Sequence, residues 1–159
     1  MPKVSAGLLL YRFREAKLQF LLVHPGGPFW RNKDAGAWSI PKGELMPGEE
    51  PLTAAKREFE EELGLKPEGR FIELTTIEQK GGKTVHAWAV EGEFDPGTLK
   101  SNYFSVEWPP RSGRQQQFPE IDRAEWFDHA HAKSKINPAQ LPWLQSLEQI
   151  LRKSQRRTQ

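Results

Sequence analysis

The sequence predicts one mixed α/β domain whose sheet has largely antiparallel or mixed pairing. Three observations support this fold class. The chain has 159 residues, which is enough for a single domain and too short for two ordinary ones. Apolar runs typical of strands come first, one strongly periodic helix lies in the middle, and helical segments close the chain. No internal repeat is evident, and this order of elements is typical of mixed α/β proteins.

The first elements are two strands and a loop. Residues 4–13 and 18–24 are rich in Val, Leu and Phe, and the short polar link between them is typical of a hairpin turn. Glycines and prolines are frequent over residues 25–36, which predicts a loop. Residues 37–40 form a short predicted strand that ends at Pro41.

The clearest helix is predicted over residues 51–63. Pro51 suits the first helical position, and Gly64 suits the residue just past the helix end. Apolar side chains recur at three- and four-residue steps along one stripe, which is formed by Leu52, Ala55, Phe59 and Leu63.

The second half of the chain is predicted to hold three more strands and two helices. Residues 71–77 and 84–90 are strands around the turn 79–82, and residues 91–120 are rich in loop-forming residues. A last strand is predicted over 123–127, a short helix capped by Asp128 follows, and a final helix covers 141–152.

Composition and charge exclude several classes of protein. Hydrophobic residues make up 36% of the chain, which is enough for one core and excludes disorder throughout. The sequence has no Cys, so disulfide scaffolds, thiolate zinc sites and cysteine nucleophiles are excluded. The net charge is +2, but the C-terminal residues Arg152, Lys153, Arg156 and Arg157 contribute +4, which leaves −2 for residues 1–151. The body of the protein is therefore not basic, and nucleic acid is not an expected partner.

Neither a targeting segment nor a membrane span is visible. The apolar run at residues 4–10 is far too short to cross a bilayer and lacks a cleavage site of small residues. We therefore expect a cytoplasmic protein that does not associate with membranes.

An unusual number of carboxylates lies on the predicted helix 51–63. Glu58, Glu61 and Glu62 fall on one face at the turn-to-turn spacing, where each like-charged pair costs roughly 0.2–0.5 kcal/mol. Only Lys56 and Arg57 offset them locally. Taken alone, the cluster is compatible with a solvated acidic surface or with a site for a hard divalent cation such as Mg²⁺ or Mn²⁺.

The residues before the helix decide between these interpretations. A glycine-rich loop over residues 41–49 leads directly into it, and the spacing from Gly43 to Leu65 resembles the Nudix box, a 23-residue loop–helix–loop motif. Every fixed position of that motif is matched, by Gly43, Glu49, Arg57, Glu58, Glu61, Glu62 and Gly64. A chance match of this length is expected about once in a million chains. The run Trp38–Glu44 is similar to that of bacterial Nudix proteins of unassigned nucleotide specificity.

The resemblance implies a Nudix fold, a mixed β-sheet sandwiched between helices (α/β/α), over residues 1–152. It implies that Glu58, Glu61 and Glu62, with the carbonyl of Gly43, hold Mg²⁺, for which Mn²⁺ can substitute. It also implies that Arg57 pairs with Glu49 to tie the loop to the helix, and that Gly64 ends the helix. Residues 153–159 have no counterpart in the family, and we expect this basic tail to fray.

The family often adds an acidic residue from a late loop, and Glu120 is the candidate here. Asp122, Glu107 and a Gln from 115–117 are the alternatives. Glu61 is the first candidate for the general base and Glu120 its rival. Three residues outside the box are candidates for substrate binding: Lys42 for a phosphate, and Trp30 and Arg31 in the loop 25–36. The four histidines show no metal-binding spacing, and we interpret them as non-catalytic.

The function implied by the resemblance is hydrolysis of a nucleoside diphosphate linked to another moiety, by attack of water on phosphorus. The substrate would be a small nucleotide such as a nucleoside triphosphate, a dinucleoside polyphosphate or a nucleotide sugar. Two alternatives stay open. One is a Nudix-fold module that binds a nucleotide without cleaving it, although no box glutamate is lost. The other is an enzyme acting on RNA 5′ ends, guided by the basic tail. Assembly into a dimer is also left open.

Overall fold

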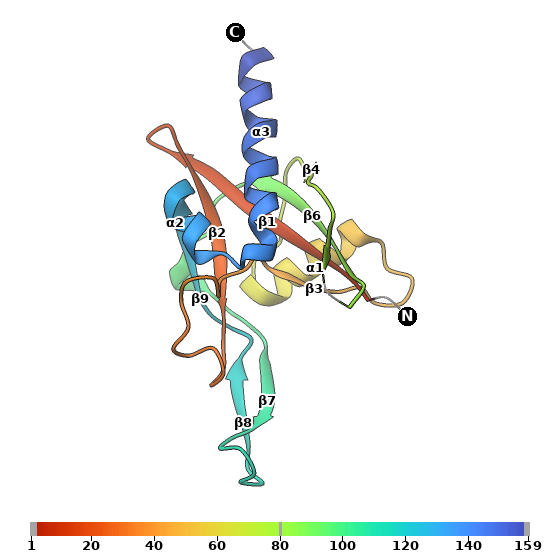
Figure 1. Ribbon diagram of the computed structural model, residues 1–159, viewed down its shortest axis with the longest axis vertical. Coiled ribbons are helices and arrows are strands. Elements are labelled where there is room, and N and C mark those ends of the chain that lie inside the picture. The colour runs from red at the N-terminus through yellow and green to blue at the C-terminus, as the bar shows by residue number, and fades with distance from the viewer. Residues whose placement is uncertain (1–2, 80, 158–159) are drawn as a thin grey trace.

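The computed structural model describes residues 3–79 and 81–157. It contains a mixed sheet of seven strands (Figure 1). Five of them follow the order β4-β6-β1-β2-β9, and the other two are β3, which pairs with β1, and β5, which pairs with β6. Helix α1 covers one face, and helices α2 and α3 cover the other. The predicted α/β/α fold is therefore confirmed. Within the described residues, no helix is long and apolar enough to cross a membrane.

The long hairpin of β1 (Val4–Arg14) and β2 (Lys17–Pro25) forms the centre of the sheet. Glu15 and Ala16 make its two-residue turn, with φ values of 52° and 65°, as tight hairpins with matching twist require. Strand β6 (Lys83–Glu91) runs parallel to β1, whereas β9 (Ile121–Asp128) is antiparallel to β2. The sheet is mixed for this reason.

The predicted strand over residues 37–40 is wrong, because this segment makes only two isolated bridges, Val23↔Ser39 and Trp38↔Ile136. The edge of β1 is instead taken by β3 (Lys42–Glu44), which pairs Ala6 with Gly43. The segment 37–40 therefore runs from beside β2 toward β1, so that residues 42–44 can pair with β1.

Helix α1 (Pro51–Leu63) has the predicted bounds. Pro51 occupies the first turn, and Gly64 adopts φ 77°, the left-handed conformation that glycine adopts at least cost. The buried side of the helix, formed by Ala54, Ala55, Phe59 and Leu63, packs against Leu8, Leu10 and Leu21 of the sheet. One side of α1 is therefore fixed to the sheet, which leaves the rest available for polar chemistry.

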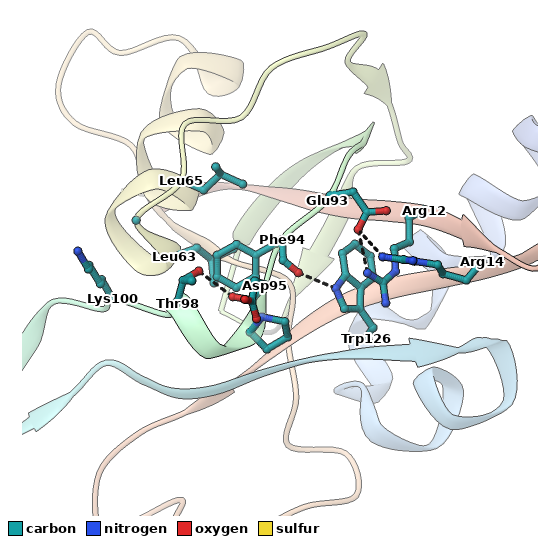
Figure 2. A pocket seen from close by; sticks show the side chains of 12 residues that line it. Arg12, Arg14, Leu63, Leu65, Glu93, Phe94, Asp95, Thr98, Lys100 and Trp126 are labelled. Atoms are coloured by element: carbon teal, nitrogen blue, oxygen red, sulfur yellow. Dashed lines mark hydrogen bonds and ion pairs between the residues drawn. The ribbon is translucent and has the colours of Figure 1, made fainter.

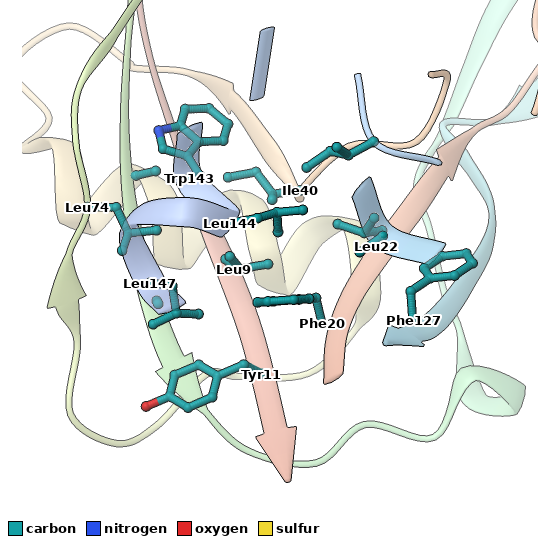
Figure 3. Packing of buried hydrophobic residues seen from close by; sticks show 14 of the residues in the cluster. Leu9, Tyr11, Phe20, Leu22, Ile40, Leu74, Phe127, Trp143, Leu144 and Leu147 are labelled. Carbon is teal, nitrogen blue, oxygen red and sulfur yellow. The ribbon is translucent and has the colours of Figure 1, made fainter. Parts of the chain in front are cut away.

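The opposite face of the sheet carries the C-terminal helices. These are α2 (His129–Lys135) and α3 (Leu141–Arg157), which are joined through a short 3₁₀ turn at Pro138–Gln140. Another 3₁₀ turn, Pro96–Thr98, lies between β6 and β7, near the end of α1. Trp143, Leu144 and Leu147 of α3 pack over Leu9, Phe20 and Leu22 (Figure 3). Helix α3 continues past the expected end at Arg152. The division of the chain after residue 152 stays a prediction, and residues 158–159 lie outside the described part.

The single strand predicted over residues 71–77 is wrong. Two short strands, β4 (Ile72–Glu73) and β5 (Ile77–Gln79), pair separately with β6. The interruption has a tertiary cause, since the indole N–H of Trp143 donates to the carbonyl of Thr75 at 2.8 Å. In the predicted turn 79–82, Lys80 lies outside the described residues.

The loop-rich interpretation of residues 91–120 missed a second hairpin. Strands β7 (Tyr103–Glu107) and β8 (Gln115–Pro119) pair with each other as a separate two-stranded sheet. Figure 1 shows this hairpin projecting away from the body of the protein. Its side chains are mostly exposed, so the apolar alternation that identifies a strand is weak here.

Candidate active site

Arg57 lies at the centre of a carboxylate cluster where the loop 41–49 meets α1. Its Nε and one Nη donate to the two oxygens of Glu49 at 2.8 and 3.0 Å, so the predicted pairing with Glu49 is present. The other Nη donates to Glu58 at 2.8 Å and to Glu61 at 3.1 Å. The guanidinium lowers the pKa of the Glu49 carboxyl, and the three carboxylates raise the pKa of Arg57. One cation thus holds the loop and two of the box glutamates together.

Gly43 provides the space that Glu58 occupies. A Cβ built at position 43 would lie 2.2 Å from Cδ of Glu58 and 2.4 Å from each of its oxygens. Any larger residue at this position would therefore displace the Glu58 carboxylate. Because β3 fixes Gly43 beside Ala6 of β1, the sheet itself positions this side of the cluster.

Glu62 is the most buried acid of the site. It is only 7% exposed, and its Oε2 has no hydrogen-bond partner among the described residues. Burial raises the pKa of this carboxyl well above its usual value, and the charges of Glu58 and Glu120 raise it further. Burial also raises the pKa of Glu58, against the lowering effect of Arg57. Lys42 faces the same acids, and burial lowers its pKa.

A cavity of about 350 Å³ brings together residues that are distant in the sequence. Glu62 of α1 and Glu120 of the loop before β9 both line it, together with Lys42 and Trp30. Glu120 is the only member of its group of alternatives that lines this cavity. Asp122 bonds His24 instead, and Glu107 and Gln115–Gln117 lie on the projecting hairpin. Arg31 is exposed next to Trp30 and does not line the cavity.

Sequence reasoning missed several polar residues of this cavity, among them Asn137 and Gln140. Gln140 is fully buried; its Oε1 accepts from the amide of Ile40 at 3.0 Å, and its Nε2 donates to Ser39 Oγ at 2.9 Å. It therefore holds the segment that leads into Lys42. No local pattern marked these residues, because they come from the turn before α3 and meet the site only through the tertiary fold.

His24 anchors the loop that carries Trp30. The ring is fully buried, and its nitrogens lie 2.8 Å from Asp122 Oδ1 and 2.6 Å from the carbonyl oxygen of Lys33. Trp38 packs edge-on against it at 5.2 Å. The imidazole thus joins the loop 25–36 to the start of β9, two residues from Glu120.

The residues present fit a hard divalent cation. Carboxylates are the ligands that Mg²⁺ and Mn²⁺ prefer, and the unpartnered buried oxygen of Glu62 is an available donor. In the described part of the chain, no three acidic or imidazole groups are yet arranged as a metal-binding cluster, and Arg57 holds Glu58 and Glu61. The carboxylates of the cluster are therefore suitable ligands for a divalent cation, and the positive charge of Arg57 balances part of their negative charge.

A second and larger cavity, of about 810 Å³, lies beyond the C-terminal end of α1 and shares no lining residue with the first (Figure 2). The Arg12 guanidinium lies 4.0 Å over the ring of Trp126 and donates to Glu93 at 2.9 Å, while Arg14 donates to the same oxygen at 3.2 Å. In this second cavity, the guanidinium groups of Arg12 and Arg14 are both already paired with Glu93. The acidic cluster is therefore the better candidate for chemistry.

Comparison with known proteins agrees with this geometry. The model of the NUDIX domain matches residues 1–147, and the chain belongs to the NUDIX family. The family typically uses a divalent metal.

The chain is 33% identical over 135 residues to an octanoyltransferase of Myxococcus xanthus, covering 85% of this chain and 33% of that protein. It is 36% identical over 90 residues to an asymmetrical bis(5′-nucleosyl)-tetraphosphatase of Caenorhabditis elegans, covering 53% and 61%. The matched region thus spans about a third of the length of the octanoyltransferase and about three-fifths of the length of the tetraphosphatase. The fold is also similar to a C. elegans Ap4A hydrolase in a binary complex, with a TM-score of 0.66, 23% identity, and coverage of 92% and 97%.

Proposed function

We propose that this protein is a Mg²⁺-dependent pyrophosphohydrolase of small nucleotides and that its substrates are dinucleoside polyphosphates. The observation that carries the proposal is the convergence of Glu62, Glu120, Lys42 and Trp30 on one cavity beside the Arg57 cluster. The similarity to a bis(5′-nucleosyl)-tetraphosphatase supports this choice among nucleotide substrates. A cytoplasmic location is part of the proposal.

Glu58, Glu61 and Glu62, with the carbonyl of Gly43, would hold the cation. When bound, Mg²⁺ neutralises phosphate charge and lowers the pKa of a coordinated water. Without such a counter-charge, the acidic face would repel a diphosphate. Arg57 is already engaged by Glu49, Glu58 and Glu61, so it orders the carboxylates rather than contacting substrate.

The other residues orient the substrate. Lys42 opens onto the cavity and presents a cationic group to a phosphate. Trp30, with Lys33 Nζ 5.0 Å from its ring centroid, offers an aromatic group to a base. Exposed Arg31 lies beside Trp30, where it can contact further phosphates. A general base then removes a proton from the attacking water, a contribution of about 10²–10⁴-fold.

Glu61 and Glu120 are the two candidates for that base. Arg57 binds the Glu61 carboxylate at 3.1 Å, which holds it in one orientation, whereas Glu120 lines the cavity without an ion-pair partner among the described residues. Replacing the base is expected to lower kcat by orders of magnitude with little change in KM. Comparing Glu61→Gln with Glu120→Gln distinguishes the two.

The direct test is a panel of nucleoside diphosphate derivatives incubated with Mg²⁺ or Mn²⁺, with products identified by mass. Reaction in ¹⁸O-labelled water should place one label in a phosphate product. If no member of a broad panel is hydrolysed but nucleotides bind, the protein is a nucleotide-binding module instead. Hydrolysis of 5′-triphosphorylated RNA in preference to all small nucleotides would favour the RNA alternative.

A further inference from the structure

The hairpin of β7 and β8 lies against the loop 25–36, from which Pro25 and Trp30 line the candidate cavity. The ring of Phe29 packs edge-on against Trp108, which follows β7, at a centroid distance of 5.7 Å. Nearer the body of the protein, a Cβ at Gly27 would come within 2.8 Å of the Phe104 ring. Backbone bonds from Gly26 to Glu120 and from Glu120 to Asn102 join the base of the hairpin to the catalytic candidate Glu120.

One side of the hairpin faces this loop. Phe104 and Val106 of β7 and Trp108, just past its end, recur at every second position, and Phe104 and Trp108 contact the loop. The amide of Trp108 donates to the carbonyl of Arg114 at 3.0 Å, so these two residues lie opposite each other. Side chains directly opposite in an antiparallel pair share a face. Arg114 therefore belongs to the face that carries Trp108 and meets Phe29.

We infer that this face binds the distal half of a dinucleoside polyphosphate while the cavity holds the half that is attacked. We define the distal surface as Phe29, Arg31, Trp108 and Arg114. Its guanidinium groups would contact the phosphate nearest the distal nucleoside, and its aromatic pair would stack against the distal base. The inference rests on the proposed function for the choice of substrate and extends it by a second subsite.

The charges of the distal surface support an anionic ligand. Arg31 and Arg114 are exposed, and among the described residues neither forms an ion pair with a carboxylate or a side-chain hydrogen bond. Arginine forks bind phosphate oxygens in pairs and stack on planar rings. Large exposed apolar side chains are few in the described chain, and Phe29 (58% exposed) and Trp30 (39%) both lie on this loop.

The same charges favour a small ligand over a nucleic acid. Two unpaired arginines match a short run of phosphates, whereas proteins that hold a polynucleotide by its backbone neutralise several more. The net charge of −2 over residues 1–151 also gives no overall attraction to a polyanion. The distal surface therefore suits the remaining phosphates and base of one dinucleotide.

The test compares diadenosine tetraphosphate with ATP, which lacks the fourth phosphate and the distal adenosine that the distal surface would contact. Arg114→Ala should raise KM for diadenosine tetraphosphate about tenfold, the effect of losing one charge-assisted hydrogen bond, and leave its kcat unchanged. The kinetic constants for ATP should not change. Arg70→Ala, which removes another exposed arginine on a different part of the surface, is the matched control and should alter neither substrate.

An equal loss for both substrates, or no loss for either, overturns the inference. So does a loss confined to a 5′-triphosphorylated RNA oligonucleotide, which would assign the surface to nucleic acid. If the wild-type enzyme hydrolyses neither compound, calorimetry can measure the binding of each nucleotide to a Glu61→Gln variant. This experiment tests the distal subsite independently of the proposed hydrolase activity. The subsite is then supported by tighter binding of diadenosine tetraphosphate than of ATP that Arg114→Ala abolishes, and refuted by equal binding.

Discussion

The Glu58 carboxylate lies directly over Gly43, in the space that any side chain at position 43 would occupy. Strand β3 and helix α1, the two segments of the Nudix box on either side of the loop 45–50, can therefore pack this closely only because position 43 has no Cβ. The spacing of the motif reflects a contact between the sheet edge and the helix.

Gly43→Ala is expected to lower kcat on the order of 10²-fold, because the methyl group must displace Glu58 and a shift of about 1 Å has that effect on aligned catalytic groups. Steady-state kinetics measures the loss, and circular dichroism checks the fold. Gly97→Ala is the control, because its new Cβ would require only a slight movement of the Asp95 carboxylate, 3.3 Å away and outside the site, and kcat should stay as in the wild type. Normal kcat in Gly43→Ala would show that Glu58 tolerates displacement.

Glu62→Gln should stabilise the metal-free protein while removing activity. Burial raises the Glu62 pKa in the folded state, so between the unfolded and folded pKa values the folded chain binds more protons. The charge therefore destabilises the native state fully above the folded pKa, and this effect disappears as pH falls below the unfolded value of about 4.3.

We expect an advantage for Glu62→Gln on the order of 1 kcal/mol at neutral pH in EDTA, and a smaller one as pH approaches 4. Urea unfolding across this pH range measures it. Excess Mg²⁺ should stabilise only the wild type, since a ligand that binds the native state raises its stability. A gap that widens in acid would contradict the assignment of Glu62 as the unpaired buried acid.

Arg57→Lys should destabilise the protein by roughly 1–3 kcal/mol and lower kcat, because an ammonium cannot reproduce the fork that binds Glu49 through two nitrogens. Chemical denaturation and kinetics measure the two effects. Arg70→Lys, on an exposed arginine outside the cluster, is the control. Equal stability of the two variants would show that charge alone suffices at Arg57.

His24→Ala should lower stability by roughly 1–3 kcal/mol, because it leaves Asp122 and the Lys33 carbonyl without their partner. The loop 25–36 then loses an anchor, and KM for the nucleotide should rise more than kcat falls. His86→Ala, which removes a less buried imidazole with one contact at 3.3 Å, should have a smaller effect. An unchanged KM would show that His24 is not needed to position Trp30 for substrate binding.

The helix 51–63 was predictable to the residue, since Pro51, its apolar stripe and Gly64 are all local signals. The Nudix box was equally readable, because its residues lie within one loop and one helix. By contrast, the strand predicted over 71–77 is interrupted by Trp143, which lies 68 positions away from Thr75 along the chain. A contact at that separation leaves no trace in the local pattern.

The sequence alone was therefore sufficient for the fold class and the family, and it also indicated the acidic residues of the candidate site. The opposing side required the folded chain, which selects Glu120 among the candidates that the sequence left open and brings Asn137 and Gln140 to the same cavity as Glu62. The hairpin that places Arg114 near Phe29 was likewise hidden, because exposed strands lack apolar alternation. Local interactions follow from neighbouring residues, whereas a cavity is defined by elements that burial of a common core brings together.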